Sequence, residues 1–362
     1  MDTPETDTPD EKRAIKGRGA LTNPDNRFGR YRYENFHDGW WQADEPRSIA
    51  TEIIEEQVKT IITTNKSPDI PFDQSINPYR GCEHGCIYCY ARPTHAYWDM
   101  SPGLDFETRI IVKPGAAALL KKALSNPNYE CKTITIGANT DPYQPLEARL
   151  GTTRELIEVL DEFNHPFSLI TKSAMVLRDV DLIAEMSRRQ LCSVAVSVTT
   201  LNNELKRKLE PRTASPAARL RTIKQLSDAG VPVTMMTAPI IPFINDHEIE
   251  DLLAAGKAAG AASANYIFLR LPLEISAMFR EWLKEHFPDK AAHVMSLVQQ
   301  SRSGNDYQSG FHTRMSGQGV FADIIKQRFR IAADRLGLAT EGRYRLDTSQ
   351  FRRVNHQLDL FN

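Results

Sequence analysis

The sequence predicts an α/β protein built on an open, partial TIM-type barrel. Two observations lead to this fold class. From Ser75 onward, short β-branched runs alternate with amphipathic segments of helical length, and about six such units follow one another. This alternation is typical of βαβ units and a parallel sheet. The chain also has 362 residues, with 41% hydrophobic and 25% charged residues, as expected for a globular protein that is large enough for one barrel.

The expected elements follow in chain order. After a first strand near residue 75, we expect strands over 109–113, 132–137, 166–171, 191–198, 231–237 and 265–271. We expect helices over 114–124, 153–163, 180–188, 203–229, 246–259, 276–286, 290–300 and 319–336. Pro114 suits a helix start and Gly230 a helix end. Residues 51–65 weakly predict a pair of strands.

These elements divide the chain into four parts. Residues 1–47 form an N-terminal arm and 48–275 the barrel core, 276–338 are a helical extension, and 339–362 are a tail. Acidic residues, prolines and threonines dominate the arm up to about residue 25, which predicts disorder. Arginines then alternate with aromatics over 26–41, a pattern that suits either single-stranded nucleic acid or packing of the arm on the core.

The overall charge and hydropathy exclude some classes of protein. The formal net charge is -1, so contact with nucleic acid would have to come from local patches. The first residues are acidic and polar, unlike a secretory signal. No apolar run reaches the roughly 18 residues of a membrane-spanning helix. We therefore expect a cytoplasmic location.

Cys82, Cys86 and Cys89 form a C-x3-C-x2-C motif directly after the first predicted barrel strand. Three thiolates can hold three irons of a [4Fe–4S] cluster and leave the fourth iron open for a second cofactor. A second interpretation is a four-ligand zinc site completed by His84 or His95. The spacing itself leaves both metal centres open.

This loop, with an aromatic residue (Tyr88) just before the last cysteine, resembles the signature of the radical S-adenosylmethionine (SAM) superfamily. The resemblance implies a radical SAM barrel in which Cys82, Cys86 and Cys89 bind a [4Fe–4S] cluster. It also implies reductive cleavage of SAM to a 5′-deoxyadenosyl radical, with an electron donor such as flavodoxin or ferredoxin. Tyr88 is then a cofactor-binding residue.

Polar side chains at successive strand ends are candidates for binding SAM, because barrel chemistry lies at the carboxyl ends of the strands. Lys172 suits the SAM carboxylate as a point charge. Ser197 and Thr199 suit the ribose hydroxyls. Asn139 and Asp141 can accept from the SAM amine, although Asp141 alternatively forms a turn ahead of Pro142.

Arg219 lies on the helical segment beyond the strand that ends at Ser197. The superfamily resemblance implies a contact between such an arginine and the methionyl carboxylate. A structural ion pair with Glu210 is the alternative. We expect Arg219 to take one of these two roles.

Residues 70–275 resemble one subgroup, the spore photoproduct lyase-like proteins often called DNA repair photolyases. The motifs that carry this resemblance are the cysteine loop, the segment 140–145 and the strand end 171–173. It implies DNA as the substrate. That chemistry needs a hydrogen donor, but Cys131 and Cys192 lie at the amino starts of predicted strands, so Tyr143 is our candidate donor.

The chain ends in a peptide that resembles the motif with which bacterial polymerases and repair proteins bind the replication sliding clamp. Its residues are Gln357, Leu358, Asp359, Leu360 and Phe361. A polar, arginine-rich stretch over 340–353 would be its flexible tether. The alternative is a tail that buries its apolar residues on its own domain.

These observations favour a radical SAM enzyme of the lyase type that acts on DNA in repair. Modification of RNA or protein by the same chemistry is the first alternative. A non-enzymatic zinc- or cluster-binding nucleic-acid module is the second.

Overall fold

A computed structural model describes residues 15–29, 50–340 and 345–354 of the chain. Its main sheet has the order β10-β9-β8-β7-β6-β3-β2, in which β2 is an antiparallel edge strand and the other six run parallel. The strands are β2 (Ile62–Thr64), β3 (Gln74–Ile76), β6 (Ile134–Ile136), β7 (Phe167–Thr171), β8 (Cys192–Ser197), β9 (Val233–Ile240) and β10 (Ser263–Phe268). The predicted open barrel of six β/α units is thereby confirmed.

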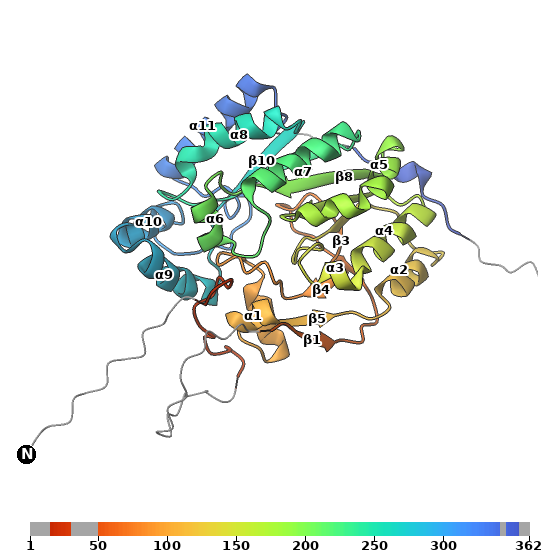
Figure 1. The fold of residues 1–362 in the computed structure, drawn as a ribbon, viewed down its shortest axis with the longest axis horizontal. Coiled ribbons are helices and arrows are strands. Elements are labelled where there is room, and N and C mark those ends of the chain that lie inside the picture. Colours follow the sequence, from red (N-terminus) through yellow and green to blue (C-terminus); the bar gives the residue numbers. More distant parts are fainter. Residues whose placement is uncertain (1–14, 30–49, 341–344, 355–362) are drawn as a thin grey trace, which may run out of the picture.

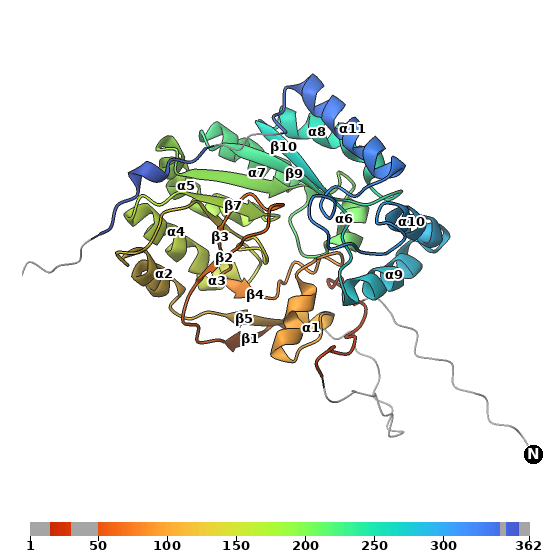
Figure 2. The same cartoon turned by 180° about the vertical axis from the view of Figure 1, so that it is seen from behind.

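Helices cover the outer side of this curved sheet (Figures 1 and 2). The α-helices are α1 (Leu104–Thr108), α2 (Ala116–Leu124), α3 (Glu147–Leu150), α4 (Thr152–Glu162), α5 (Val180–Arg188), α6 (Asn203–Leu209), α7 (Pro216–Asp228), α8 (Ile249–Ala258), α9 (Glu274–His286), α10 (Pro288–Gln300) and α11 (Val320–Leu336). Short 3-10 helices are η1 (Arg92–Trp98), η2 (Ala174–Asp179), η3 (Asp246–Glu248) and η4 (Thr348–Gln350).

The helical segments predicted over 203–229 are two helices, α6 and α7. Asn202 caps α6, and Ser215 caps α7 ahead of Pro216, which suits the first position of a helix. Glu210, at the end of α6, therefore lies in a connecting turn. This break places its carboxylate in the site described below.

A second, three-stranded sheet lies beside the barrel and has the order β1-β5-β4. Its strands are β1 (Glu52–Glu55), β4 (Tyr79–Arg80) and β5 (Arg109–Val112). The strand pair predicted over 51–65 is therefore wrong in its pairing, because β1 pairs with β5 and β2 pairs with β3. Both strands exist, but β1 pairs with the distant β5, whereas β2 pairs with β3, the next strand along the chain.

The core is mainly one large apolar cluster between the sheet and its helices, with a smaller cluster beside the cysteine loop and two minor ones. The smaller cluster joins Cys86 and Tyr88 to apolar residues of α9 and α10, including Trp282. Helix α11 packs on α8 and adds Ile325 and Phe329 to the large cluster. The helical extension is thus part of both cores. No helix among the described residues is long and apolar enough to cross a membrane.

The segment 345–354 is docked and not a free tether as predicted. The Phe351 ring lies 5.5 Å from His165 and 5.7 Å from Tyr129, at the amino ends of β7 and β6. Arg353 donates to the carbonyls of Pro127 and Tyr129. The predicted clamp-binding peptide, Gln357 to Phe361, lies outside the described residues, as do residues 1–14 and 30–47 of the predicted arm.

Candidate active site

The three motif cysteines lie in a loop that follows β3 at the carboxyl end of the sheet. Cys82 and Cys86 are 7% and 8% exposed, and Cys89 is half-buried. The amide of Cys82 donates to the Phe106 carbonyl at 2.8 Å, and Arg92 Nε donates to the Cys86 carbonyl at 2.9 Å. The backbone of the loop is thus held by buried partners on both sides.

The three thiols suit a metal cluster. All three are free of disulfides. Burial raises the pKa of each thiol, and mutual repulsion with Cys86 and Cys89 further raises the pKa of Cys82. Coordination to iron deprotonates a thiol and removes this cost, because the metal charge replaces the missing solvent. A buried set of three thiols within electrostatic reach of one another therefore fits the iron cluster.

The histidines considered for a zinc site bind elsewhere. His84 Nδ1 lies 3.3 Å from Asp141 Oδ2, and His95 Nε2 lies 3.0 Å from the carbonyl oxygen of Arg109. These contacts favour the cluster over the zinc interpretation.

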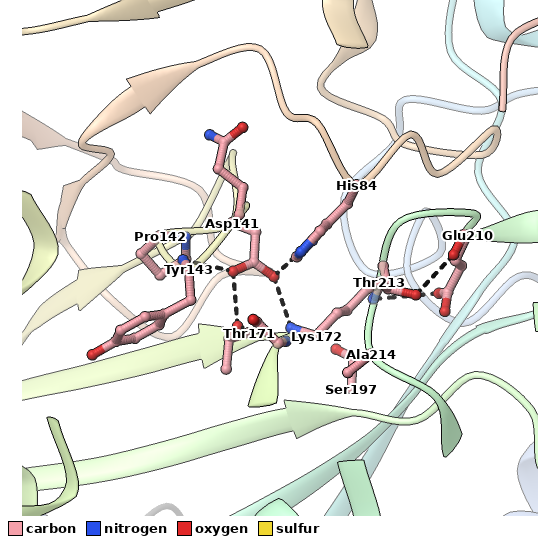
Figure 3. Close-up of polar contacts among 12 residues, drawn as sticks. His84, Asp141, Pro142, Tyr143, Thr171, Lys172, Ser197, Glu210, Thr213 and Ala214 are labelled. Carbon is pink, nitrogen blue, oxygen red and sulfur yellow. Dashed lines mark hydrogen bonds and ion pairs between the residues drawn. The ribbon is translucent and has the colours of Figure 1, made fainter. Parts of the chain in front are cut away.

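The Asp141 carboxylate, a candidate for binding the SAM amine, already accepts hydrogen bonds from the protein. Its oxygens accept from the Tyr143 amide at 2.9 Å, Thr171 Oγ1 at 2.7 Å and the Lys172 amide at 2.7 Å, and they face His84 (Figure 3). Burial acts to raise the pKa of Asp141, but His84 and the donors hold it below its usual value. The contact with the Tyr143 amide is the turn that the sequence offered as the alternative role.

Tyr143, the candidate hydrogen donor, points away from this site. Its side chain is fully buried in the large core, and its hydroxyl donates to Asp179 Oδ2 at 2.8 Å. Figure 3 shows its ring on the far side of Asp141 from His84. The structure thus contradicts the expected role of Tyr143, because its ring is packed in the core. Cys192 is buried at the amino start of β8, as expected.

Glu210 is the centre of a buried network next to the cysteine loop. It accepts from Tyr88, Thr199 (2.7 Å) and Arg219, and Lys172 Nζ lies 3.9 Å away. Burial acts to raise the pKa of Glu210, but Arg219 first and Lys172 second lower it to about 2. The carboxylate therefore stays ionised and fixes the Tyr88 and Thr199 side chains.

Of its two expected roles, Arg219 has the structural one, the ion pair with Glu210. It is 1% exposed, and besides Glu210 its guanidinium donates to the Ser197 carbonyl (2.9 Å), the Ala214 carbonyl (2.9 Å) and Thr213 Oγ1 (2.5 Å). These contacts use four of the five N–H donors of the guanidinium. Arg219 acts on the site by holding Glu210 and the end of β8 in place.

Lys172, the candidate for the SAM carboxylate, is partly exposed beside this network. Its side chain is 17% exposed, and its Nζ lies 5.9 Å from the centre of the Tyr88 ring and 3.5 Å from the Ala238 carbonyl oxygen. Asn139 is half-buried three residues beyond β6, and its backbone N–H donates to Asn77 Oδ1 at 2.8 Å. The predicted strand-end residues therefore lie together at the carboxyl edge.

Residues 15–29, which we call the N-terminal strap, pack against the cysteine loop. The amides of Gly19 and Ala20 donate to the two oxygens of Glu107 at 3.0 and 2.8 Å. Glu107 is also paired with Arg92, and both side chains are fully buried. A Cβ on Gly19 would lie 1.7 Å from the Gly85 carbonyl oxygen. The disorder predicted up to residue 25 is therefore wrong for residues 15–25, because Glu107 binds their backbone.

Comparison with known proteins identifies the family. A model of the radical SAM superfamily matches residues 76–255. An uncharacterized protein of Mycobacterium tuberculosis is 38% identical over 238 residues, which are 64% of this chain and 70% of that protein. An uncharacterized protein of Methanocaldococcus jannaschii is 29% identical over 66% of this chain and 85% of its own.

Solved structures share the fold at low sequence identity. Spore photoproduct lyase complexed with dinucleoside spore photoproduct has a TM-score of 0.55 and 15% identity, over 79% of this chain and 80% of that one. A mutant of that lyase with bound AdoMet and the same dinucleoside has a TM-score of 0.54. The chain belongs to the radical SAM superfamily, whose enzymes use a [4Fe–4S] cluster and S-adenosylmethionine.

Proposed function

We propose that the protein is a radical SAM enzyme of the lyase type that acts on DNA in the repair of a lesion. The observation that carries the proposal is the arrangement of the buried cysteine loop, Lys172 and the Glu210 network at the carboxyl edge of one barrel. The fold shared with spore photoproduct lyase, whose solved complex contains a dinucleoside lesion, supports DNA as the substrate class.

In this proposal Cys82, Cys86 and Cys89 hold the cluster, and Lys172 binds the carboxylate of SAM. When bound, the two cofactors supply a 5′-deoxyadenosyl radical that abstracts hydrogen from an unactivated carbon. The electron would come from a small donor protein such as flavodoxin or ferredoxin.

The chain's own side chains would position the cofactors and exclude water. Glu210 would hold the Tyr88 and Thr199 hydroxyls in place, and its negative charge would hold Lys172 beside them. Ser197 and Asn139, at neighbouring strand ends, are proposed partners of the ribose and the amine. Burial of the loop by the strap and by α9 and α10 would keep bulk solvent from the reaction.

The test is anaerobic reconstitution with iron and sulfide, followed by reduction with dithionite in the presence of SAM. Formation of 5′-deoxyadenosine is expected from the wild type and its loss from Cys86→Ala, and ultraviolet-irradiated DNA should raise turnover above that with untreated DNA. Cleavage of SAM that no DNA stimulates, while RNA or a protein does, would move the proposal to the alternative substrate. Zinc without iron, and no 5′-deoxyadenosine, would refute an enzyme of this family.

A further inference from the structure

Arg270 is a cation at the mouth of the barrel that has no acidic partner in the part of the chain that the structure describes. It lies two residues beyond β10, and its guanidinium carbon is 5.1 Å from the centre of the Tyr90 ring and 6.0 Å from that of Tyr307. Within the described residues, no carboxylate lies within ion-pair distance of it. Its polar contacts are weak ones, 3.5 Å from Nη2 to the Tyr307 hydroxyl and 3.4 Å from Nη1 to Met315 Sδ.

Arg270 also has a buried polar atom that the described chain does not satisfy. Its Nε is shielded from solvent without a hydrogen-bond partner, and so is Oε1 of Gln308, the residue that follows Tyr307 in sequence. Leaving a buried donor or acceptor unpaired costs roughly 1–3 kcal/mol, so native proteins rarely do so without reason. A neighbouring arginine shows the usual solution, since Arg280 is paired with Asp306.

Tyr90 places this cation beside the cysteine loop. It directly follows Cys89, it is 43% exposed, and its hydroxyl donates to the Ala138 carbonyl just beyond β6. Its ring meanwhile faces Arg270, beyond β10 at the end of the sheet. Tyr90 therefore crosses the mouth of the open barrel, and a ligand bound at Arg270 would lie next to the cluster loop.

The loop that carries Tyr307 is fixed to the barrel. Arg302 is fully buried and donates to the Leu269 carbonyl at 2.8 Å and the Arg314 carbonyl at 2.9 Å. The Phe268 amide also donates to the Met315 carbonyl at 2.8 Å. Burial, with a further contribution from the Arg270 charge, lowers the pKa of Arg302 to about 10. An anion at Arg270 would relieve that repulsion.

We propose that Arg270, between Tyr90 and Tyr307, binds a backbone phosphate of the DNA strand that carries the substrate nucleotide, with the exposed Tyr90 ring as a stacking surface for a base. This inference rests on the proposed function and names a binding site for its substrate. A guanidinium fork matches two phosphate oxygens, and aromatic rings accept any base face. A phosphate would also give the terminal nitrogens of Arg270 stronger partners than their present long contacts with Met315 and Tyr307.

The test measures binding of a fluorescein-labelled, thymidine-rich DNA strand, irradiated and untreated, by anisotropy under anaerobic conditions with the reconstituted enzyme and SAM. The variants are Arg270→Gln, Arg270→Lys and, as a matched control, Arg328→Gln, which removes a cation paired with Glu250 on α8. We expect Arg270→Gln to weaken binding about tenfold and to reduce the salt slope by roughly 0.7–0.9. Arg270→Lys should keep the slope and lose part of the affinity, and Arg328→Gln should match the wild type.

The outcomes separate this inference from the proposed function. No DNA binding by the wild type would overturn both. Equal affinity and equal salt slope for wild type and Arg270→Gln would overturn the phosphate site alone. Arg270-dependent binding of an RNA strand in preference to DNA would overturn the assignment to DNA, and a loss of SAM binding with DNA binding intact would overturn the site as a substrate contact. Thermal unfolding of each variant identifies any that fails to fold.

Discussion

The two sides of the barrel mouth differ in how their charges are satisfied. Around the cysteine loop, the buried ions are paired: Arg92 with Glu107, and Arg219 with Glu210. Arg270 lies beside the same loop, next to Tyr90, but this cation has aromatic neighbours and an unpaired Nε. We call these the closed side and the open side.

The difference indicates what each side binds. A buried ion pair offsets its desolvation only when its geometry is fixed, so the closed side is rigid before any ligand arrives. Rigid surroundings whose charges are already paired suit a cofactor that stays in place. Unsatisfied groups instead suit a ligand that comes and goes, because binding supplies the missing partner and release takes it away again. On this view the closed side holds the cofactors and the open side holds the substrate.

The largest effect is expected from Glu107→Gln, which breaks the closed side. The change leaves Arg92 buried without an opposite charge and puts an amide donor among the donors of Gly19 and Ala20. We expect a loss of about 3–5 kcal/mol in unfolding free energy, measured by urea denaturation, together with a lower iron content. The matched control is Glu250→Gln, whose half-exposed pair with Arg328 should cost at most about 1 kcal/mol. Similar losses for both variants would contradict the contrast between the two sides.

The catalytic loop was the part most open to prediction from sequence. Cys82, Cys86 and Cys89 fall within eight residues, so their proximity follows from chain connectivity. The barrel was also predictable, because buried parallel strands and amphipathic helices have different periods that repeat along the chain. Lys172 was named as a candidate for the same reason, since it directly follows β7.

The partners of the loop could not be predicted in the same way. Glu107 binds the strap across 87 and 88 residues of sequence, and Arg270 meets Tyr90 only because β10 ends beside the loop. No local pattern marks such contacts. Tyr143 failed for a related reason, because the sequence shows that a tyrosine follows Asp141 but not that its ring turns into the core. Two glycines within three residues, Gly17 and Gly19, were the one hint of a close backbone approach.

The second prediction concerns acid sensitivity of the closed side. His95 in η1 is fully buried, and burial lowers its pKa to about 4, with Asp105 and the Arg109 carbonyl acting against this. In the unfolded chain His95 takes up a proton as the pH falls below its ordinary pKa of 6.5. In the folded chain it does so only near pH 4. Stability is therefore complete above pH 6.5 and falls, by as much as about 3 kcal/mol, as the pH drops toward 4.

Urea titrations between pH 7 and 5 measure this loss, and His95→Gln should flatten the curve. His165, also buried and with a pKa lowered to about 4, lies at the opposite end of the barrel and provides the comparison. Hydrogen exchange at pH 5 should increase in residues 81–100 of the wild type but not of His95→Gln. An unchanged pH dependence in His95→Gln would show that the imidazole is not kept neutral by the fold.

The third prediction tests the strap. Gly19→Ala would place a Cβ 1.7 Å from the Gly85 carbonyl oxygen, and the obstacle is backbone that cannot rotate away. We expect the strap to lift, with a loss of roughly 1–3 kcal/mol and faster bleaching of the reconstituted cluster in air. Gly310→Ala is the control, because its nearest contact would be an ordinary 3.7 Å. Equal bleaching rates for both variants would mean that the strap does not shield the loop.

The smallest effect is expected from Tyr307→Phe on the open side. The hydroxyl contact with Arg270 is long at 3.5 Å, and the ring that flanks the guanidinium is retained. Unfolding free energy should change by less than about 0.5 kcal/mol, and DNA affinity in the anisotropy assay by less than about twofold. Tyr307→Ala, which also removes the ring, should weaken DNA binding several-fold if the ring orients Arg270 or contacts a base. A large loss of DNA affinity from Tyr307→Phe would instead mean that the hydroxyl fixes Arg270. The polar groups of the open side would then be paired before a ligand binds, as they are on the closed side.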